Sequence, residues 1–233
     1  MVSVIIPVYN QASKIVKTLV SLEKQTDQDF EVIIINDGST DNLEEVLGNF
    51  FKNSKSERTY EVLSQKNSGA PAARNAGFRA SHGDLLLFCD ADAALAPEAL
   101  AEMKKALSEN LEAAYAYSSF MWGKKLFKLG AFNADKLRSM PYIHTMSLLR
   151  REAFPASGWD ESIRKLQDWD LWLTILEQGK AGCFIDKVLF SIQTGGHISN
   201  WLPAFAYKLL PFLPNVKKYK RAVAIVKTKH GLK

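Results

Sequence analysis

The sequence has few cysteines and nothing typical of a secretory leader. Only Cys89 and Cys183 occur among 233 residues, and both lie in apolar runs. We therefore expect buried free thiols in a reducing cytoplasm and no disulfide. No basic stretch and no small-residue cleavage site accompany the first apolar run, at residues 2–7. That run is therefore expected to be a strand and not part of a signal peptide.

Acidic residues are absent from the last part of the chain. From Lys187 onward there are nine basic residues and no Asp or Glu, whereas the whole chain has a net charge of +5. The preceding residues therefore carry a net charge of 5 − 9 = −4. This asymmetry predicts an anionic partner for the C-terminal segment and not for the whole protein. A nucleic-acid partner is not expected.

The apolar part of this segment is too short and too broken to span a membrane. It begins at Trp201 and is interrupted by Pro203, Pro211 and Pro214. We expect residues 1–200 to form one domain and residues 201–233 to form a basic amphipathic tail. The tail is expected to bind the anionic inner face of a membrane from the cytoplasm. A tail that packs on the domain or forms oligomer contacts is the alternative.

Strand-like and helical patterns alternate through the first half of the chain. Strands are expected at residues 2–8, 30–36, 60–64 and 84–89, and helices at residues 12–25, 42–52, 70–80 and 97–110. The strands are nearly continuous Val, Ile and Leu, which is typical of strands buried on both faces. Such alternation predicts an α/β, Rossmann-like fold with a parallel sheet.

The second half is less regular. Strands are expected at residues 113–119 and 145–149, a helix at residues 169–178, and two short strands that pair with each other at residues 181–185 and 188–193. The segment between Phe120 and Tyr142 is basic, aromatic and poorly periodic, so it is interpreted as loops. No linker separates the two halves, and a single domain is expected.

Distinctive polar residues follow three of the expected strands. They are Tyr9-Asn10, the segment from Asn36 to Asp41, and the triplet Asp90-Ala91-Asp92. Ligands of parallel sheets bind beyond the carboxyl ends of the strands, and Mg²⁺ or Mn²⁺ takes one or two carboxylates plus substrate phosphates. The triplet is thus a candidate metal site, with an ordinary solvated loop as the alternative. Asp41, with Glu44 three residues later, also resembles a helix-capping box.

Five motifs, in this order, resemble the family 2 glycosyltransferases with the GT-A fold. They are residues 2–10, residues 32–41, residues 67–69 with 73–77, residues 83–92, and the segment Gln167-Asp168-Trp169-Asp170-Leu171-Trp172. The resemblance implies a single GT-A domain with a mostly parallel central sheet flanked by helices. It also implies an inverting, metal-dependent transfer of a sugar from a nucleoside diphosphate sugar, most often UDP-linked, to an acceptor hydroxyl. A glycan or lipid-linked acceptor in cell-surface glycan synthesis is the expected partner.

The resemblance also implies roles for the donor side of the site. Asp37 matches the aspartate that accepts a hydrogen bond from the nucleobase, and Pro7 and Tyr9 line the same base pocket. Arg74 matches a position near the nucleotide, with a structural salt bridge as the alternative. Ala91 is expected to contact the nucleotide, and Asp90 is expected to contact its ribose or, alternatively, the metal shell.

Two residues are implied as ligands of a Mn²⁺ or Mg²⁺ ion. Asp92 would bind the ion, which acts as a Lewis acid on the leaving diphosphate. His197 fits a position where a histidine approaches the metal or the diphosphate, although a structural role is the alternative. His144 matches no motif and receives no role.

Asp168 matches the general base that removes the proton of the attacking hydroxyl. An N-cap aspartate is the alternative, because Asp168 lies at the start of an expected helix. The chain departs from the family at Asn36 and Gln167, where acidic residues are frequent. Trp159, Trp169 and Trp201 are candidate stacking faces for a sugar or, alternatively, core residues.

Rival functions fit less well. A haloacid dehalogenase-type phosphatase carries its Asp-x-Asp on the first strand, whereas here three strands precede it. A dinucleotide oxidoreductase needs Gly-x-Gly-x-x-Gly after a strand, and a sugar nucleotidyltransferase has a glycine-rich N-terminal loop; neither occurs here. A degenerate family member that binds nucleotide or glycan without turnover is the non-enzymatic alternative.

Overall fold

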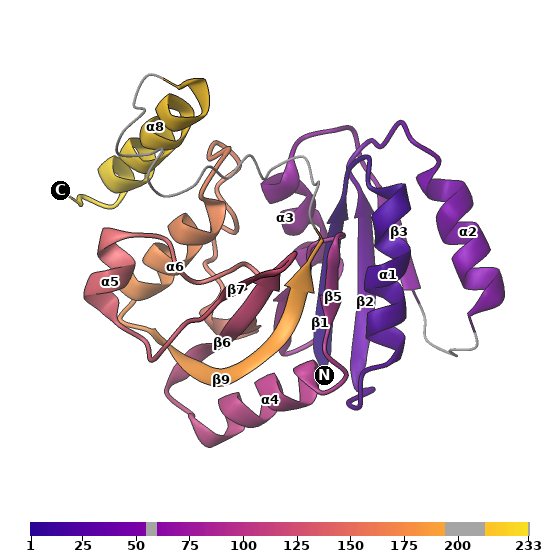
Figure 1. Ribbon diagram of the computed structural model, residues 1–233, viewed down its shortest axis with the longest axis horizontal. Helices are drawn as coiled ribbons and strands as arrows, with labels where there is room; N and C mark the ends of the chain where they lie inside the picture. The colour runs from indigo at the N-terminus through magenta and orange to yellow at the C-terminus, as the bar shows by residue number, and fades with distance from the viewer. Residues whose placement is uncertain (55–59, 194–212, 233) are drawn as a thin grey trace.

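A computed structural model describes residues 1–54, 60–193 and 213–232. Within these residues the strands form one nine-stranded sheet with helices on both faces (Figure 1). Eight strands follow the order β3-β2-β1-β4-β8-β6-β9-β5, and β7 pairs with β6 at the side of this path. Functional side chains can therefore converge from both halves of the chain at one edge of the sheet.

The first half forms the parallel part of the sheet as predicted. Its strands are β1 (Val2–Val8), β2 (Phe30–Asn36), β3 (Tyr60–Ser64) and β4 (Leu85–Phe88), and its helices are α1 (Ala12–Glu23), α2 (Leu43–Asn53), α3 (Ala70–Ala80) and α4 (Ala99–Glu109). Every expected element is present, with bounds that differ by two residues at most. Continuous apolar runs and short connections made these elements predictable from the sequence.

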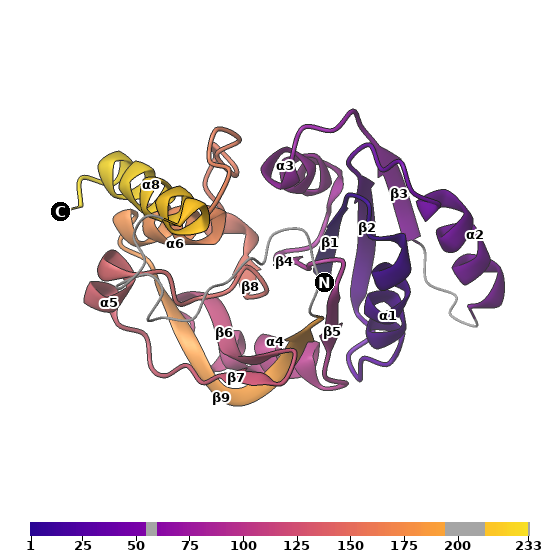
Figure 2. The same ribbon diagram turned by 45° about the horizontal axis from the view of Figure 1, so that its top comes forward.

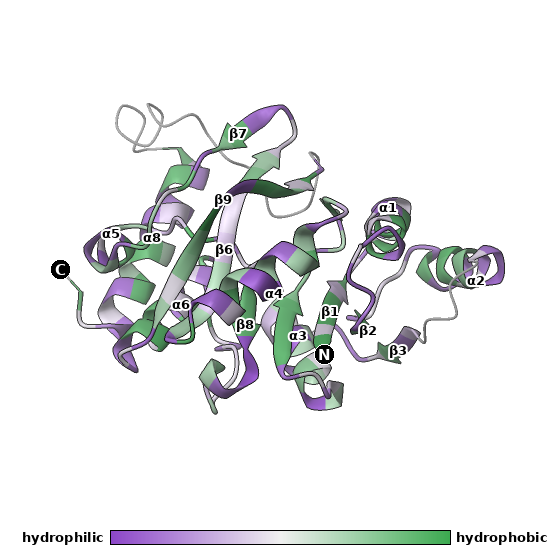
Figure 3. Ribbon diagram, turned by 90° about the horizontal axis from the view of Figure 1, so that it is seen from below, coloured by the Kyte–Doolittle hydropathy of each residue, from purple (hydrophilic) through white to green (hydrophobic). Residues whose placement is uncertain are grey.

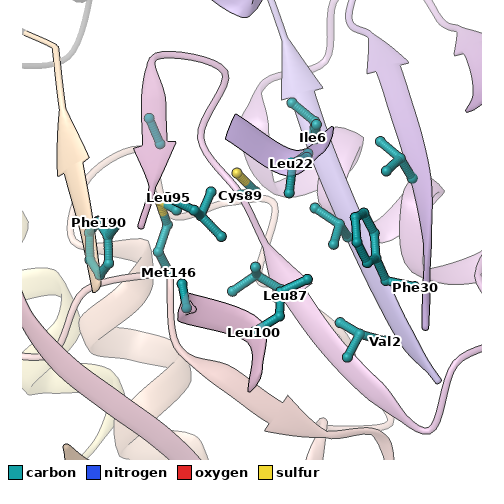
Figure 4. Close-up of a cluster of buried hydrophobic side chains, with 14 of the residues drawn as sticks. Val2, Ile6, Leu22, Phe30, Leu87, Cys89, Leu95, Leu100, Met146 and Phe190 are labelled. Carbon is teal, nitrogen blue, oxygen red and sulfur yellow. The ribbon is translucent and has the colours of Figure 1, made fainter. Parts of the chain in front are cut away.

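The two faces of the sheet bury different side chains of the same strands. Val2, Val4 and Ile6 of β1 pack in a cluster with α1, α2 and α4, which Figure 4 shows around Leu22, Leu87 and Leu100. Ile5 points to the opposite face, where α6 packs. Along α4, hydrophilic and hydrophobic residues alternate (Figure 3), because only one of its faces covers the sheet.

The second half extends the sheet with strands of mixed direction. They are β5 (Ala93–Leu95), β6 (Ala113–Trp122), β7 (Lys125–Phe127), β8 (Leu148–Arg150) and β9 (Ala181–Ile192). Of these strands, β8 runs antiparallel to both β4 and β6, whereas β6 and β9 are parallel to each other. Six of the nine strands in the described residues share one direction, which confirms a mostly parallel central sheet.

The prediction of two short strands that pair with each other near residue 186 is wrong. The segment is one strand, β9, whose partners are β6 and β5. Asp186 and Lys187 interrupt the apolar pattern because they lie in a bulge, where the register shifts from Ile185 to Val188. Both side chains are exposed.

The prediction of loops between residues 120 and 142 is also wrong in part. β6 continues to Trp122 and turns into β7, and the rings of Phe120 and Phe127 stack at a centroid distance of 4.9 Å. A short helix, α5 (Ala134–Ser139), begins after Asn133, whose side chain accepts the backbone N–H of Lys136 at 2.8 Å. Both features depend on tertiary contacts or on a single cap, and periodicity does not reveal them.

The remaining helices pack on the face opposite α1 and α2. They are α6 (Gln167–Glu177) and α8 (Pro214–Lys229), which meet near the C-terminal end of α8 (Figures 1 and 2). Val226 of α8 is buried in the same cluster as Trp172 of α6. The described part of the expected tail thus packs on the domain, whereas its start at residue 201 lies outside the described residues. Among the residues that the structure covers, no helix is long and apolar enough to cross a membrane.

Candidate functional site

The loops after β1 and β2 are tied to each other. Asn10 has a left-handed backbone conformation (φ 51°), and its side chain accepts the N–H of Thr40 at 2.8 Å. Asp41 Oδ2 accepts the N–H of Ala12 at 2.9 Å, at the start of α1. The capping-box interpretation of Asp41 is therefore wrong: it satisfies an amide of α1, and the N-cap of its own helix, Asn42, makes no side-chain cap.

Asp37 organises the loop that follows β3. Its Oδ1 accepts Gln65 Nε2 at 2.7 Å and the N–H of Ser68 at 2.9 Å, and its Oδ2 accepts the N–H of Gly69 at 2.8 Å. In the described part of the chain Gly69 is the single donor to Oδ2, and a carboxylate oxygen can accept two hydrogen bonds. Beside it, Tyr9 is 43% exposed and Pro7 is half-buried.

The Asp90-Ala91-Asp92 turn is clamped by its backbone. Thr18 Oγ1 of α1 lies 2.9 Å from the carbonyl oxygen of Ala91 and 2.6 Å from that of Ala93. The N–H of Gln193, just after β9, donates to the carbonyl oxygen of Asp92 at 2.9 Å. Elements from both halves of the chain thus fix where the two carboxylates emerge.

The two carboxylates of this turn have different surroundings. Asp92 is 9% exposed, and its cationic partner among the described residues is Lys14, whose Nζ lies 3.8 Å from Oδ2. Burial, with the charge of Asp90 as a second cause, raises the pKa of Asp92 to about 6. Asp90 is more exposed and pairs with Arg74, whose Nη2 lies 3.2 Å from Oδ1. Within the described residues, no group of three or more His, Cys, Asp or Glu side chains is arranged to hold a metal ion by itself.

Arg74 connects the turn to the start of α6. Its guanidinium is buried, donates from Nη1 to Gln167 Oε1 at 2.9 Å, and lies over the ring of Trp159 at 4.7 Å. The salt-bridge alternative for Arg74 therefore describes its contact with Asp90, and the contact with Gln167 is a hydrogen bond. Gln167 also donates from Nε2 to the carbonyl oxygen of Ile163 at 3.1 Å, a bond that a glutamate cannot make.

Asp168 lies in the first turn of α6, on the same side as this network. Its Oδ1 accepts the N–H of Trp169 at 2.9 Å, and the N-cap position is occupied by Leu166, so Asp168 is not the N-cap. Burial raises the pKa of Asp168, and the hydrogen bond from the N–H of Trp169 opposes this shift. Leu171 and Trp172 anchor the helix in the core, as expected.

His144 is the site residue that sequence reasoning missed. Its Nε2 lies 3.8 Å from Asp90 Oδ2, and burial lowers its pKa while the charges of Asp90 and Asp168 oppose the shift. Because β8 runs antiparallel to β4, the segment that leads into β8 lies beside the end of β4. The sequence pattern predicts a strand here but not its partner or its direction. The position of His144 beside Asp90 therefore could not be predicted.

The remaining candidates have other outcomes. Trp159 and Trp169 are almost fully buried, and Trp169 Nε1 donates to the carbonyl oxygen of Leu137 at 2.6 Å, so both belong to the core. Trp201 and His197 lie outside the described residues.

Sequence comparisons place these residues among known proteins. The sequence model described as Glycosyl transferase family 2 matches residues 3–157. An uncharacterized glycosyltransferase of Rickettsia bellii (strain RML369-C) is 31% identical over 210 residues, which cover 84% of this chain and 29% of that protein. A chondroitin synthase of Pasteurella multocida (strain Pm70) is 29% identical over 195 residues, which cover 77% of this chain and 19% of that protein. The chain thus spans less than a third of either relative.

Solved structures share the fold. S. aureus TarS in complex with UDP-GlcNAc matches with a TM-score of 0.70 and 19% identity, over 91% of this chain and 64% of that chain. The mannosyltransferase PcManGT from Pyrobaculum calidifontis, in complex with GDP-Man and Mn²⁺, matches with a TM-score of 0.69 and 19% identity, over 84% of this chain and 57% of that chain. At these identities the likeness shows the fold alone, and it confirms the expected GT-A architecture.

Proposed function

The chain belongs to the family 2 glycosyltransferases, and from this premise we propose that it transfers a sugar from a UDP-linked donor to an acceptor hydroxyl with inversion. The observation that carries the proposal is the convergence of Asp90 and Asp168 on one connected network. Arg74 contacts both Asp90 and Gln167, the residue next to Asp168. It therefore fixes the position of the end of β4 relative to the start of α6.

The donor nucleotide is assigned to the ends of β1, β2 and β4. Asp37 keeps one acceptor position open for a nucleobase N–H, and Tyr9 offers an exposed ring beside it. TarS and PcManGT, which share the fold, were solved with UDP-GlcNAc and GDP-Man, respectively. These structures support a nucleoside diphosphate sugar as the donor, with Asp90 and Ala91 next to the nucleotide.

The residues present fit a divalent metal ion. Asp92 is a buried carboxylate with a pKa of about 6, and Lys14, the cation beside it, lies 3.8 Å away. Its oxygen atoms are therefore suitable ligands for a metal cation. Mg²⁺ and Mn²⁺ take one or two protein carboxylates plus substrate phosphates, so a larger protein cage is not required. Asp92 would hold the ion, with His197 as a second ligand, and the bound ion would neutralise charge on the departing diphosphate.

Asp168 is assigned as the general base. The acceptor oxygen forms a bond to the anomeric carbon, the bond from that carbon to the diphosphate oxygen breaks, and the hydroxyl proton moves to Asp168. A carboxylate whose pKa is raised by burial is a stronger base than an exposed one, which favours this transfer. The proposed acceptor is a glycan or a lipid-linked acceptor in cell-surface glycan synthesis.

A donor screen tests this function. Purified protein is incubated with UDP- and GDP-linked sugars, with and without Mn²⁺, and release of the free nucleoside diphosphate is measured. We expect Mn²⁺-stimulated release from at least one UDP sugar and none from the Asp168→Asn variant. Nucleotide binding without release or transfer, with every donor and a range of acceptors, would instead identify a degenerate member of the family.

We also place the membrane contact of the C-terminal segment on α8. Lys217, Lys218, Lys220 and Arg221 are exposed, and no ion pair involves them among the described residues. No Asp or Glu follows residue 186, so the rest of the segment supplies no acidic partner either. Each such cation near an anionic leaflet contributes about 1 kcal/mol to binding.

Liposome co-sedimentation tests this contact. Replacing all four cations by Gln should abolish sedimentation with phosphatidylserine vesicles while the melting temperature stays near that of the wild type. This variant is preferable to deletion of residues 201–233, which would also remove the buried contacts of Val226. Equal sedimentation of wild type and variant would rule the contact out.

A further inference from the structure

His144 sits in the centre of the candidate site without a role in the proposed function. It precedes β8 and packs against Phe120 and Phe190, two rings that stack on each other, with centroid distances of 4.9 Å and 5.2 Å from the imidazole. Its side chain is 14% exposed. A ring held this tightly has one orientation, so its two nitrogen atoms have fixed and different surroundings.

The backbone determines which nitrogen atom carries the proton. Nδ1 accepts the N–H of Met146 at 3.1 Å. A nitrogen atom that accepts a hydrogen bond has no proton, so the ring is neutral and its single proton is on Nε2. Burial, which lowers the pKa of His144, agrees with this assignment.

The Nε2–H group faces one side of Asp90. Asp90 Oδ2 lies 3.8 Å away, and Arg74 Nη2 approaches the other oxygen, Oδ1, at 3.2 Å. Arg74 comes from α3 and His144 from the segment before β8, so the carboxylate lies between donors from two separate elements. A separation of 3.8 Å is too long for a hydrogen bond, and contacts of this kind tighten when a substrate binds.

We propose that His144 is a positioning residue for the donor, and that its Nε2–H closes on Asp90 Oδ2 when the nucleotide binds and turns the carboxylate toward the nucleotide. The inference rests on the proposed function, because it requires a nucleotide beside Asp90. It assigns no proton transfer to His144: the imidazole stays neutral and acts as a hydrogen-bond donor.

A matched set of substitutions separates the two nitrogen atoms. The amide nitrogen of Gln reaches the place of Nε2, whereas the amide of Asn reaches only the place of Nδ1. We expect His144→Ala to weaken UDP binding in the presence of Mn²⁺ by about tenfold to a hundredfold, the loss of one hydrogen bond to a charged acceptor. His144→Gln should restore most of that affinity, and His144→Asn should not.

The coupling to Asp90 is tested by a double-mutant cycle. In an Asp90→Ala background, His144→Ala should change UDP binding by less than about twofold, since its effect passes through the missing carboxylate. Additive losses would overturn the proposal, as would restoration by Asn and not by Gln, which would show a role for Nδ1 in holding the backbone. Melting temperatures of all variants identify any that fail to fold.

A spectroscopic measurement keeps the proposal testable if the variants do not fold. Two-bond ¹H–¹⁵N correlation spectra of the wild-type protein report the protonated nitrogen atom of each histidine. A neutral ring with the proton on Nε2 is expected for His144, and a proton on Nδ1 or on both nitrogen atoms would overturn the inference. If the wild type binds neither UDP nor GDP, the proposed function fails, and the spectrum still decides the state of His144.

Discussion

Two clusters of carboxylates, each with at least one member on α6, have opposite surroundings. The strand-end cluster consists of Asp90, Asp92 and Asp168, and the C-terminal clasp consists of Asp160, Asp170 and Glu177 with Lys229 and His230. In the clasp, Lys229 Nζ lies 2.7 Å from Asp160 Oδ2 and 2.8 Å from Asp170 Oδ1, and His230 bridges Asp170 and Glu177 at 2.9 and 2.7 Å. In the strand-end cluster, Asp92 is 3.8 Å from its cation.

The clasp has the chemistry of a structural contact. Carboxylates only accept hydrogen bonds, so both ring nitrogen atoms of His230 must carry protons, and the ring is cationic. Asp170 is buried, and its carboxylate contacts both Lys229 and His230. Its negative charge is therefore compensated within the clasp. The difference between the clusters teaches that charge compensation, and not the number of acids, separates a contact that holds the fold from a site prepared for a ligand.

The largest expected effect comes from substituting Asp168, the member of the strand-end cluster that lies on α6. Asp168→Asn should lower kcat by about 10²–10⁴-fold, the contribution of general-base catalysis, with UDP affinity within about twofold of the wild type. Because burial raises the pKa of Asp168, its charged form is disfavoured in the fold, and the melting temperature should stay equal or rise. Steady-state kinetics, calorimetric UDP titration and thermal melting measure these three outcomes, and full residual activity would contradict the assignment.

Asp92→Ala should act mainly on the metal-dependent binding of the nucleotide and not on the transfer step itself. Loss of outer-sphere partners alone lowers metal affinity by about 10–100-fold, so removal of a direct ligand should weaken Mn²⁺-dependent UDP binding by at least as much. UDP binding without metal should change little. Titrations with and without Mn²⁺ distinguish these cases, and lost transfer with unchanged Mn²⁺-dependent binding would count against a metal role for Asp92.

Asp170→Asn is the matched control on the compensated side of α6, two residues from Asp168. It should lower the free energy of unfolding by about 1–3 kcal/mol, below the ~3–5 kcal/mol typical of fully buried pairs, because Lys229 is 38% exposed and partly screened. The kcat of the folded variant should remain near that of the wild type. Urea unfolding and kinetics test this contrast, which fails if Asp170→Asn abolishes transfer without loss of stability.

The smallest expected effect depends on pH. The pKa of His230 is raised from 6.5 by its hydrogen bonds to Asp170 and Glu177, which outweigh its burial. The stability that this charge contributes is complete below the unfolded pKa and is lost as the pH rises through the folded pKa. His230→Gln should therefore lower the melting temperature by about 2–4 °C near pH 6, and this difference should shrink toward pH 9. A difference that grows with pH would show that His230 is neutral in the fold.

Most of the first half was predictable because its signals are local. Continuous apolar runs and short connections predicted β1 to β4 and the helices between them, and the order of motifs predicted the family. Asp90, Asp92 and Asp168 were candidates for the same reason, since each follows or begins a recognisable element.

The second half was less predictable because its signals are not local. A bulge at Asp186 and Lys187 divided one strand into two apparent ones, and the packing of Phe120 on Phe127 is visible only once β6 and β7 pair. For the C-terminal segment, composition showed its charge but not that Lys229 and His230 are used to hold it on α6.

The sequence by itself determined the family, the strands and helices of the parallel half and the identity of the acidic residues. Only the tertiary structure decided that Asp168 lies near Asp90 while Asp170 belongs to the clasp, and that His144 lies beside Asp90. The physical reason is range: periodicity and motif spacing report on neighbours along the chain. The partner of a charge, by contrast, depends on which distant elements the shared core brings together.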